Sequence, residues 1–448
     1  MKKLLVNFLK KIFSPICLII SLYLLYYTYH QSEIYWNGIK SDYYLPYYII
    51  STILIIFSIL TFFLNQKIKE YLIILLISII VGLYFFEGYF TFKEKNTRER
   101  LYEKETGKKY DLRTRLEIYE DLKKIDNNVK IVVFPQIYID KKNKIFSLSG
   151  ISNSNTIHCN ESGYYSTYKS DRYGFNNPDK EWDQKEIEYL LVGDSFAHGA
   201  CENRPNDIAS VLRALSNKSV LNLAYDGNGP LIEYATLREY LSSKVKKVLW
   251  IYYEGNDLSD LDDKLKKEIL KNYLHDLTFT QNLKAKQNKI DVLANEKLEI
   301  ERKTEKTMKK LRVKAEFKNF LKITSTRKIL SNYLPEKYQP QPQPQPQLKL
   351  KFKKILKLAK DLTLKNNSKL YFIYLPEYRH YKKNFNNNSY QLVKKIINEL
   401  NIPFIDIHTE VFEKEQNPLK LFPFELPPHY NIEGYRKVAE TIYQFTKD

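Results

Sequence analysis

The chain has 448 residues, enough for two or three folding units of roughly 100 to 200 residues each. Its formal net charge is +19, but the basic residues are spread along the chain without an RNA-binding or DNA-binding motif, so we predict no nucleic-acid partner. The 7 histidines show no paired ligand spacing, and neither a C-x-x-C pair nor a G-x-x-x-x-G-K-[ST] phosphate loop occurs. These patterns predict no metal and no other cofactor.

Three apolar runs dominate residues 1–92, which we predict to be a membrane region. They lie near Ile12–Tyr29, Tyr43–Leu64 and Tyr71–Phe92, and each is close to the length that crosses a hydrocarbon core about 30 Å thick. A cleavable signal peptide is the other interpretation of the first run, but no A-x-A-like cleavage site follows it.

The orientation of these three transmembrane helices follows from their flanking charges. Lysines before the first run and after the second favour a cytoplasmic location for both ends: Lys2, Lys3, Lys10, Lys11, Lys67 and Lys69. Basic residues that follow the third run favour the opposite, although long domains translocate largely regardless of charge: Lys93, Lys95, Arg98 and Arg100. Glu87 lies near the outer end of the third run, where we expect it to reach the interface. We predict a multi-pass membrane protein whose large carboxyl-terminal part is extracytoplasmic (periplasmic).

A charged connector at 93–128, with a helical stretch at Leu116–Ile125, precedes a predicted accessory β region at 129–187. The stretch "VKIVVFPQIYI" at 129–139 is rich in β-branched and aromatic residues and predicts a strand broken by Pro135. Cys17 lies within the first apolar run, so Cys159 and Cys201 are the two cysteines of the large part. In an oxidising compartment these two would form a disulfide, and two unrelated thiols are the alternative.

Short apolar strands alternate with helices in the remainder of the chain. The strand candidates are Tyr189–Val192, Val220–Leu223, Val248–Tyr253, Leu370–Leu375 and Pro403–Ile407, and helices are expected at Ile208–Leu215, Ile232–Leu241 and Tyr390–Leu400. Fully apolar strands in this alternation predict an α/β domain at 188–257 and 368–448, with a five-stranded parallel sheet between two helical layers in the flavodoxin-like order.

Residues 258–367 interrupt this alternation. They begin with helical spacing of apolar residues from Leu258 to Leu277, continue with a charged helical stretch, and contain the polyproline-type linker "QPQPQPQPQ". We predict a helical insertion, which is either solvated surface or a cap or docking arm over the functional site.

Polar residues follow three of the predicted strands at the edge where a doubly wound sheet assembles its site. The segments are "GDSF" at Ser195, "DGNG" at Gly227 and "EGND" at Asn256, and "HYNIEG" at His429 comes later in the chain. Four such blocks in this order resemble the SGNH (GDSL-type) hydrolase superfamily, and "SDRYGFNNP" resembles an element of its membrane-linked members.

The resemblance implies a role for each block. Ser195 would be the nucleophile and His429 its base, with an oxyanion hole formed by the Ser195 N–H, the Gly227 N–H and the Asn256 side chain. A serine hydroxyl needs a base to become nucleophilic, and charge on a carbonyl oxygen needs fixed donors. His198 is three residues from Ser195 and competes for the role of base, but we expect a structural or substrate-contacting role for it.

One block departs from the family, whose last block reads Asp-x-x-His where this chain has Leu426. An orienting acid fixes the tautomer of the catalytic imidazole, so its identity matters. Three accounts stay open: Glu425 replaces the aspartate, Ser195 and His429 act as a dyad, or the site is degenerate. Asp406, near the end of the last strand, is a fourth candidate.

The resemblance implies a membrane-anchored serine esterase that cleaves O-acyl esters, with an envelope glycan or another extracytoplasmic ester as substrate. An O-acyltransferase that works beside a membrane acyl-donor protein is the first alternative. A non-catalytic glycan-binding protein of the same fold is the second, and Leu426 is its support in the sequence.

Overall fold

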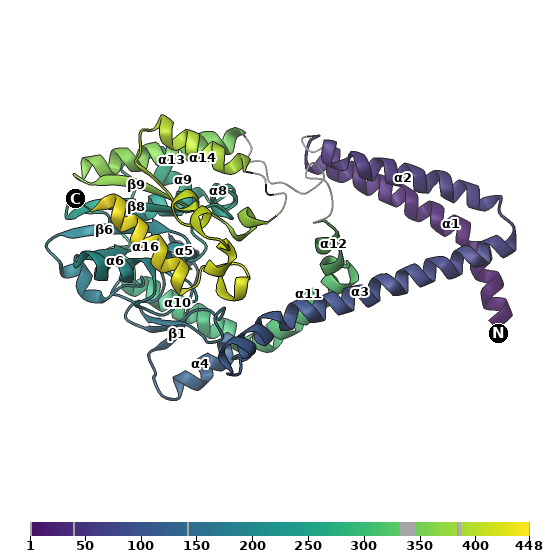
Figure 1. Ribbon diagram of the computed structural model, residues 1–448, viewed down its shortest axis with the longest axis horizontal. Coiled ribbons are helices and arrows are strands. Elements are labelled where there is room, and N and C mark those ends of the chain that lie inside the picture. Colours follow the sequence, from purple (N-terminus) through teal and green to yellow (C-terminus); the bar gives the residue numbers. More distant parts are fainter. Residues whose placement is uncertain are drawn as a thin grey trace. The chain divides into compact units, whose positions relative to one another are not determined.

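The structure is a computed structural model that describes residues 2–38, 41–140, 143–331, 346–382, 385 and 387–447 (Figure 1). The chain forms two compact units, Met1–Asn96 with Met308–Pro342, and Thr97–Thr307 with Gln343–Asp448. Most of the predicted Pro-Gln linker lies outside the described residues, and its last two residues open helix α13 (Pro346–Lys365).

Three helices of the first unit are long and apolar enough to cross a membrane. They are α1 (Lys2–Tyr29), which continues as a π-helical turn (His30–Tyr35), α2 (Ser41–Phe62) and α3 (Gln66–Thr106). Helices α1 and α2 lie side by side, with the Ser21 and Ser58 hydroxyl oxygens 2.9 Å apart (Figure 1). Helix α3 extends beyond the predicted span, so the first part of the expected connector is helical.

Glu87 of α3, which we predict to reach the membrane interface, has hydrogen-bond partners within the first unit. Its side chain is buried and accepts backbone N–H groups from Ser325 at 3.0 Å and Thr326 at 2.8 Å. These donors belong to the first turn of α12 (Thr324–Ser331), which follows α11 (Glu305–Leu321). Because the first N–H groups of a helix have no intrahelical acceptor, the carboxylate completes that helix end.

Five parallel strands form the main sheet of the second unit, as predicted. The strands are β6 (Ile187–Gly193), β7 (Val220–Asn222), β8 (Val245–Tyr253), β9 (Lys369–Leu375) and β10 (Phe404–Asp406). Their spatial order is β10-β9-β8-β6-β7, the flavodoxin-like arrangement. All seven residues of β6 are buried, which explains why the strand has no polar face.

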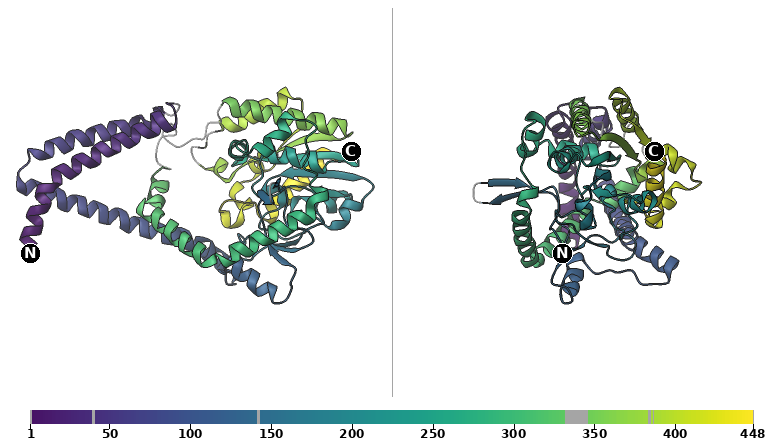
Figure 2. Two further views of the ribbon diagram at one scale, coloured as in Figure 1. Left: turned by 180° about the vertical axis from the view of Figure 1, so that it is seen from behind. Right: turned by 90° about the vertical axis from the view of Figure 1, so that its left-hand side faces the viewer.

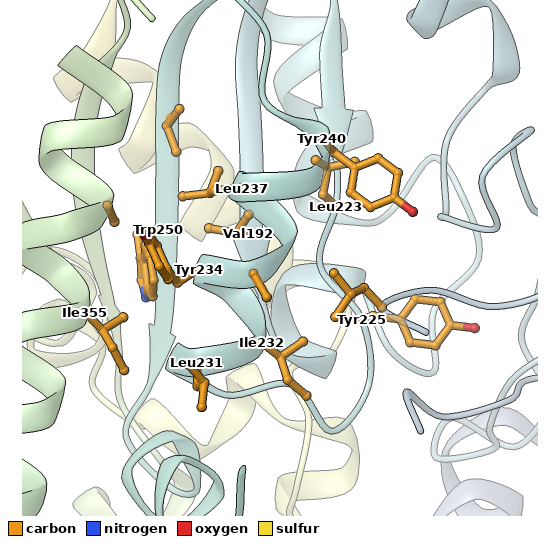
Figure 3. Packing of buried hydrophobic residues seen from close by; sticks show 14 of the residues in the cluster. Val192, Leu223, Tyr225, Leu231, Ile232, Tyr234, Leu237, Tyr240, Trp250 and Ile355 are labelled. Atoms are coloured by element: carbon orange, nitrogen blue, oxygen red, sulfur yellow. The ribbon is translucent and has the colours of Figure 1, made fainter. Parts of the chain in front are cut away.

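Helices cover both faces of this sheet. Leu190, Val192 and Trp250 pack into one cluster with residues of α7 (Pro230–Tyr240), α13 and α14 (Asn388–Glu399). Leu191 and Ile251 point to the other face, against α6 (Ile208–Ser216) and α16 (Ile432–Thr446). Figure 3 shows the first cluster, with the Trp250 ring beside Tyr234 and opposite Ile355. The three-layer architecture thus matches the sequence prediction.

The accessory region contains two small sheets. Helix α4 (Arg115–Lys123) precedes a three-stranded sheet of β1 (Val129–Ile131), β4 (Asn155–Ile157) and β5 (Thr167–Lys169), in the order β1-β4-β5. Strands β2 (Ile137–Asp140) and β3 (Asn143–Phe146) form an antiparallel hairpin, visible at the edge of the right-hand view in Figure 2. Pro135 separates β1 from β2, as the broken strand pattern predicts.

Much of the predicted insertion contributes to the core of the second unit. The amphipathic stretch forms two helices, α8 (Asp257–Lys264) and α9 (Glu268–His275), and α10 (Gln287–Lys303) follows. Leu261, Tyr273 and Ile290 are buried in the same cluster as Trp250, as is Ile355 of α13. These helices therefore extend the helical layer on one face of the sheet.

Short elements complete this unit around the main sheet. The α-helical turns are α5 (Ser195–His198) and α15 (Ile407–Glu410), and the 3-10 turns are η2 (Asp179–Asp183), η3 (Lys284–Lys286), η5 (Tyr378–Tyr381), η6 (Phe412–Lys414), η7 (Pro418–Leu421) and η8 (Pro423–Glu425).

Candidate active site

The nucleophile candidate Ser195 stands at a tight turn between β6 and α5. Asp194 caps the helical turn, because its carboxylate accepts the Phe196 N–H at 2.9 Å. Gly193 is required for space, since a Cβ there would lie 2.6 Å from the Ala197 Cβ and 2.7 Å from the Ile251 oxygen. The turn therefore presents the Ser195 hydroxyl at the carboxyl end of β6.

His429 joins this serine to a carboxylate. Its Nε2 lies 2.9 Å from the Ser195 Oγ, and its Nδ1 lies 2.9 Å from Oε1 of Glu161. The backbone N–H of His429 also donates to Oε2 of Glu161, at 3.2 Å. The His429 and Glu161 side chains are 15% and 13% exposed, so the three groups form a mostly buried, continuous chain of hydrogen bonds.

Glu425, the sequence-based candidate for the orienting acid, is not the carboxylate that contacts His429. Its side chain is exposed and accepts a hydrogen bond from the Asn417 amide at 2.9 Å. The backbone at Glu425 and Phe424 has positive φ, at 56° and 57°, in the turn that precedes His429. Asp406 is also elsewhere, accepting the Tyr390 hydroxyl at 2.6 Å.

Glu161 is held in place by its surroundings in the accessory region. Cys159, two residues before it, forms a disulfide with Cys201, which follows the nucleophile turn. The guanidinium of Arg98 donates to the Glu161 carbonyl oxygen at 2.8 Å and lies 4.0 Å from its carboxylate. Sequence reasoning missed Glu161, although the expected Cys159–Cys201 bridge was a signal that this segment lies beside Ser195.

The oxyanion-hole candidates lie on loops that follow the three neighbouring strands β6, β7 and β8. Gly227 has φ of +70°, and a Cβ there would meet only the Phe134 ring, at 3.8 Å. Asn228 fixes this loop, donating to the Gly193 carbonyl oxygen at 3.1 Å. The Asn256 amide donates to Asp260 at 2.8 Å. Because parallel strands end at one edge, the Ser195 and Gly227 N–H groups and the Asn256 amide come to the same side of the sheet.

Comparisons with known proteins return structures only, since no family model and no curated protein matches the chain. A lipolytic protein of the G-D-S-L family from Desulfitobacterium hafniense is 15% identical, covering 58% of this chain and 99% of its own, with a TM-score of 0.32. A G-D-S-L family member from Veillonella parvula is 14% identical over 58% of this chain and 97% of its own, with a TM-score of 0.31. An acetyl-xylooligosaccharide esterase from Geobacillus Stearmophilus is 12% identical over 59% of this chain and 97% of its own, with a TM-score of 0.30.

The sheet order is flavodoxin-like, and the blocks that contain Ser195 and His429 meet at the carboxyl edge of the sheet. The second unit has a flavodoxin-like three-layer fold, which fits the fold that the resemblance to SGNH (GDSL-type) hydrolases implies.

The electrostatics of the SGNH site link Glu161 and His429. Burial by itself raises the pKa of Glu161, but the charge and hydrogen bonds of His429, together with Arg98, hold that pKa below its usual value. Burial by itself lowers the pKa of His429, but the charge and hydrogen bond of Glu161 raise it above the usual value. The carboxylate therefore stabilises the imidazolium that forms when His429 accepts a proton.

His198 does not contact the nucleophile, in line with the structural role expected for it. It is 1% exposed and packs against the rings of His158, Tyr168 and Tyr225, with ring centroids 4.8, 4.9 and 5.4 Å away. Burial, and then the neighbouring His158, lower the pKa of His198 to about 3. Its ring is therefore neutral at neutral pH.

Three buried carboxyl groups lie behind the nucleophile turn. Burial raises the pKa of Asp194 to about 7, and burial and mutual repulsion raise those of Glu233 and Asp257 well above their usual values. Like-charged groups in an apolar environment cannot all ionise, so they bind protons instead. The Glu161 carboxylate, with its lowered pKa, is thus the ionised acid that contacts His429.

Proposed function

We propose that the chain is a membrane-anchored serine ester hydrolase that cleaves O-acyl esters. The observation that carries the proposal is the hydrogen-bond chain from Glu161 through His429 to Ser195, with 2.9 Å at both steps along the imidazole. A serine, a histidine and an acid in this order are the nucleophile, base and orienting acid of acyl transfer on many folds. Glu161 supplies the carboxylate whose absence at position 426 supported the non-catalytic alternative.

Acylation starts when the Ser195 Oγ attacks the carbonyl carbon of the ester. His429 Nε2 accepts the hydroxyl proton, and Glu161 stabilises the resulting imidazolium through Nδ1. The carbonyl oxygen becomes an oxyanion, for which the Ser195 N–H, the Gly227 N–H and the Asn256 amide are the proposed donors. The tetrahedral adduct then expels the alcohol, which takes the proton from His429, and the acyl group remains on Ser195.

Deacylation repeats these steps with water as the acceptor. His429 removes a proton from the water as its oxygen attacks the acyl carbon, and the second tetrahedral adduct releases the carboxylic acid and returns the proton to Ser195. A sugar hydroxyl in place of water would make the same site an acyltransferase.

The location proposed for the reaction is the extracytoplasmic face of a membrane, with an envelope glycan as the esterified substrate. Three helices long and apolar enough to span a bilayer support the anchoring. The Cys159–Cys201 disulfide supports an oxidising compartment, where such bonds form and persist.

A fluorophosphonate probe tests the proposal on the full-length protein in detergent. We expect one covalent adduct, mapped by mass spectrometry to the peptide that contains Ser195, together with hydrolysis of p-nitrophenyl acetate. The Ser216→Ala variant, altered at the end of α6, serves as the matched control and should label like the wild type. Labelling of another serine, or of none, would rule out the proposed nucleophile.

The products distinguish water from a sugar as the acceptor. With an oligosaccharide present, a hydrolase releases free acetate at an unchanged rate, whereas a transferase places the acetyl group on the oligosaccharide.

The pH dependence of the reaction follows from the state of His429. Only the neutral imidazole can accept the serine proton, so kcat/KM should fall as the pH drops through the pKa of His429. Glu161 raises that pKa, so the loss begins at a higher pH than for an ordinary histidine, whose pKa is about 6.5. In the Glu161→Gln variant the descending limb should move to lower pH. A pH profile of kcat/KM for the wild type and for the variant measures the acidic limb of each. An acidic limb at the same pH in both proteins would contradict the assignment.

A further inference from the structure

A second group of polar side chains lies buried next to the catalytic site. His158 follows β4, His198 ends α5, and Asp226 stands in the loop after β7. They are 2%, 1% and 9% exposed, and one ligand atom from each lies within 4.8 Å of the others. The sequence showed no paired ligand spacing because these residues come from three separate segments.

Polar atoms in this group lack hydrogen-bond partners among the described residues. His158 Nε2 lies 2.5 Å from Asp226 Oδ2, which satisfies one contact. Both ring nitrogens of His198 and the Oδ1 of Asp226 are buried without any partner. A buried donor or acceptor without a partner is unfavourable, and in native structures it indicates a bound water or ion.

We propose that His158, His198 and Asp226 bind a divalent transition-metal ion, with zinc as the best match. Two neutral imidazoles and one carboxylate are ligands that zinc takes in proteins, at about 2.0 to 2.2 Å. Ligand atoms around a tetrahedral ion are about 3.4 Å apart, so His158 Nε2 and Asp226 Oδ2, now 2.5 Å apart, would separate by about 0.9 Å while the His198 ring moves toward them. No hydrogen bond among the described residues fixes the orientation of the His198 ring.

The types of ligand at the site favour zinc over calcium or magnesium. Those hard cations take six or more oxygen ligands, largely carboxylates, carbonyls and waters. This group offers one carboxylate and two imidazole rings, a set that contains too few oxygen ligands for a hard cation. A metal bound through neutral imidazole nitrogens fits these surroundings, and the ion would replace the proton between His158 and Asp226.

The ion would act on the catalytic site without contacting the substrate. His198 is three residues after Ser195, and Asp226 directly precedes Gly227. Coordination would therefore join the nucleophile turn, the Gly227 loop and the accessory region, and fix the spacing of two proposed oxyanion donors. The site is independent of which ester is cleaved.

Metal content of the full-length protein tests the proposal. The protein is expressed in zinc-supplemented medium with an affinity tag free of histidine, dialysed against metal-free buffer, and measured by inductively coupled plasma mass spectrometry. We expect about one zinc per chain in the wild type and less than about one-tenth of that in the His158→Gln and His198→Gln variants. The matched control is His408→Gln, a histidine outside the group, which should retain the metal.

A second measurement on the wild type stays informative where a variant fails to fold. Removing the metal with a chelator should lower the midpoint of thermal unfolding, and added zinc should restore it, because a ligand that binds the folded state stabilises it. The proposal would be overturned if the wild type contained no metal and added zinc did not raise its unfolding midpoint. A bridging water would then be the occupant of the site. Equal zinc content in wild type and folded His198→Gln would also overturn it.

Discussion

Replacing Ser195 by alanine should lower kcat for p-nitrophenyl acetate by about 10⁴-fold or more, with little change in KM. The substitution removes the hydroxyl whose oxygen attacks the ester carbon and which donates its hydrogen bond to His429 Nε2 at 2.9 Å. Binding contacts made by the rest of the site remain, and the oxyanion donors still act on direct attack by water. Steady-state kinetics of the full-length protein in detergent measure the loss.

The protein carrying Ser195→Ala should stay folded, which circular dichroism and the thermal unfolding midpoint can verify. Ser216→Ala again provides the control, since its hydroxyl makes local contacts alone, donating to the Leu212 carbonyl oxygen and accepting the Lys218 N–H. Residual turnover within tenfold of the wild type would show that another group is the nucleophile.

Replacing Glu161 by glutamine should lower kcat by about 10²- to 10⁴-fold. Glutamine has nearly the same shape, but it lacks the charge that stabilises the imidazolium of His429. Its amide can also present an N–H to Nδ1 and so favour the wrong tautomer of the ring. KM should change little, because the carboxylate faces His429 at 2.9 Å and has no assigned contact with the ester.

Glu425→Gln is the matched control for Glu161→Gln. Both changes remove one negative charge. Glu161 is near His429 in space and Glu425 is near it in sequence, but the Glu425 carboxylate is exposed and accepts a hydrogen bond from the Asn417 amide. Its loss should therefore change kcat by less than about threefold, within the range of an exposed charge. The reverse order of the two effects would return the role of orienting acid to Glu425.

The main sheet could be predicted because its strands are apolar on both faces. Leu190 and Leu191 pack on opposite sides of β6, so the buried run is continuous and distinct from an amphipathic helix. Strand β8 begins three residues before its predicted start, at Val245, because Lys247 lies inside the strand. That lysine reaches the Thr446 carbonyl oxygen and the Glu188 carboxylate, at 2.7 and 2.8 Å, contacts that local sequence does not reveal.

The bounds and packing partners of some helices could not be predicted from the local sequence. The spacing of Leu258, Leu261, Leu265 and Ile269 predicts one helix, but the chain turns between Lys264 and Glu268 and forms two. The position of Glu87 in its apolar run gives no sign of its hydrogen-bond partners, which are 238 and 239 residues away in the sequence. Such partners come from packing and not from periodicity.

The proposed catalytic residues also differ in how far the sequence alone could place them. Ser195, Gly227 and Asn256 follow predicted strands, so the topology alone brings them to one edge. Glu161 lies outside the sheet, 268 residues from His429, in a region without regular periodicity. The family pattern predicts the acid at position 426, three residues before the histidine. The orienting acid, however, needs to be close to His429 only in space.

The most direct test of the account is the hydrogen bond between His429 and Glu161, observed by proton NMR of the full-length protein in detergent. An imidazole Nδ1 proton shared with a carboxylate resonates far downfield and disappears when the histidine is replaced, so His429→Gln assigns it. We predict this resonance in the wild type and in Glu425→Gln, and its loss in Glu161→Gln. Persistence of the resonance in Glu161→Gln, or its loss in Glu425→Gln, would contradict the assignment of Glu161 as the orienting acid.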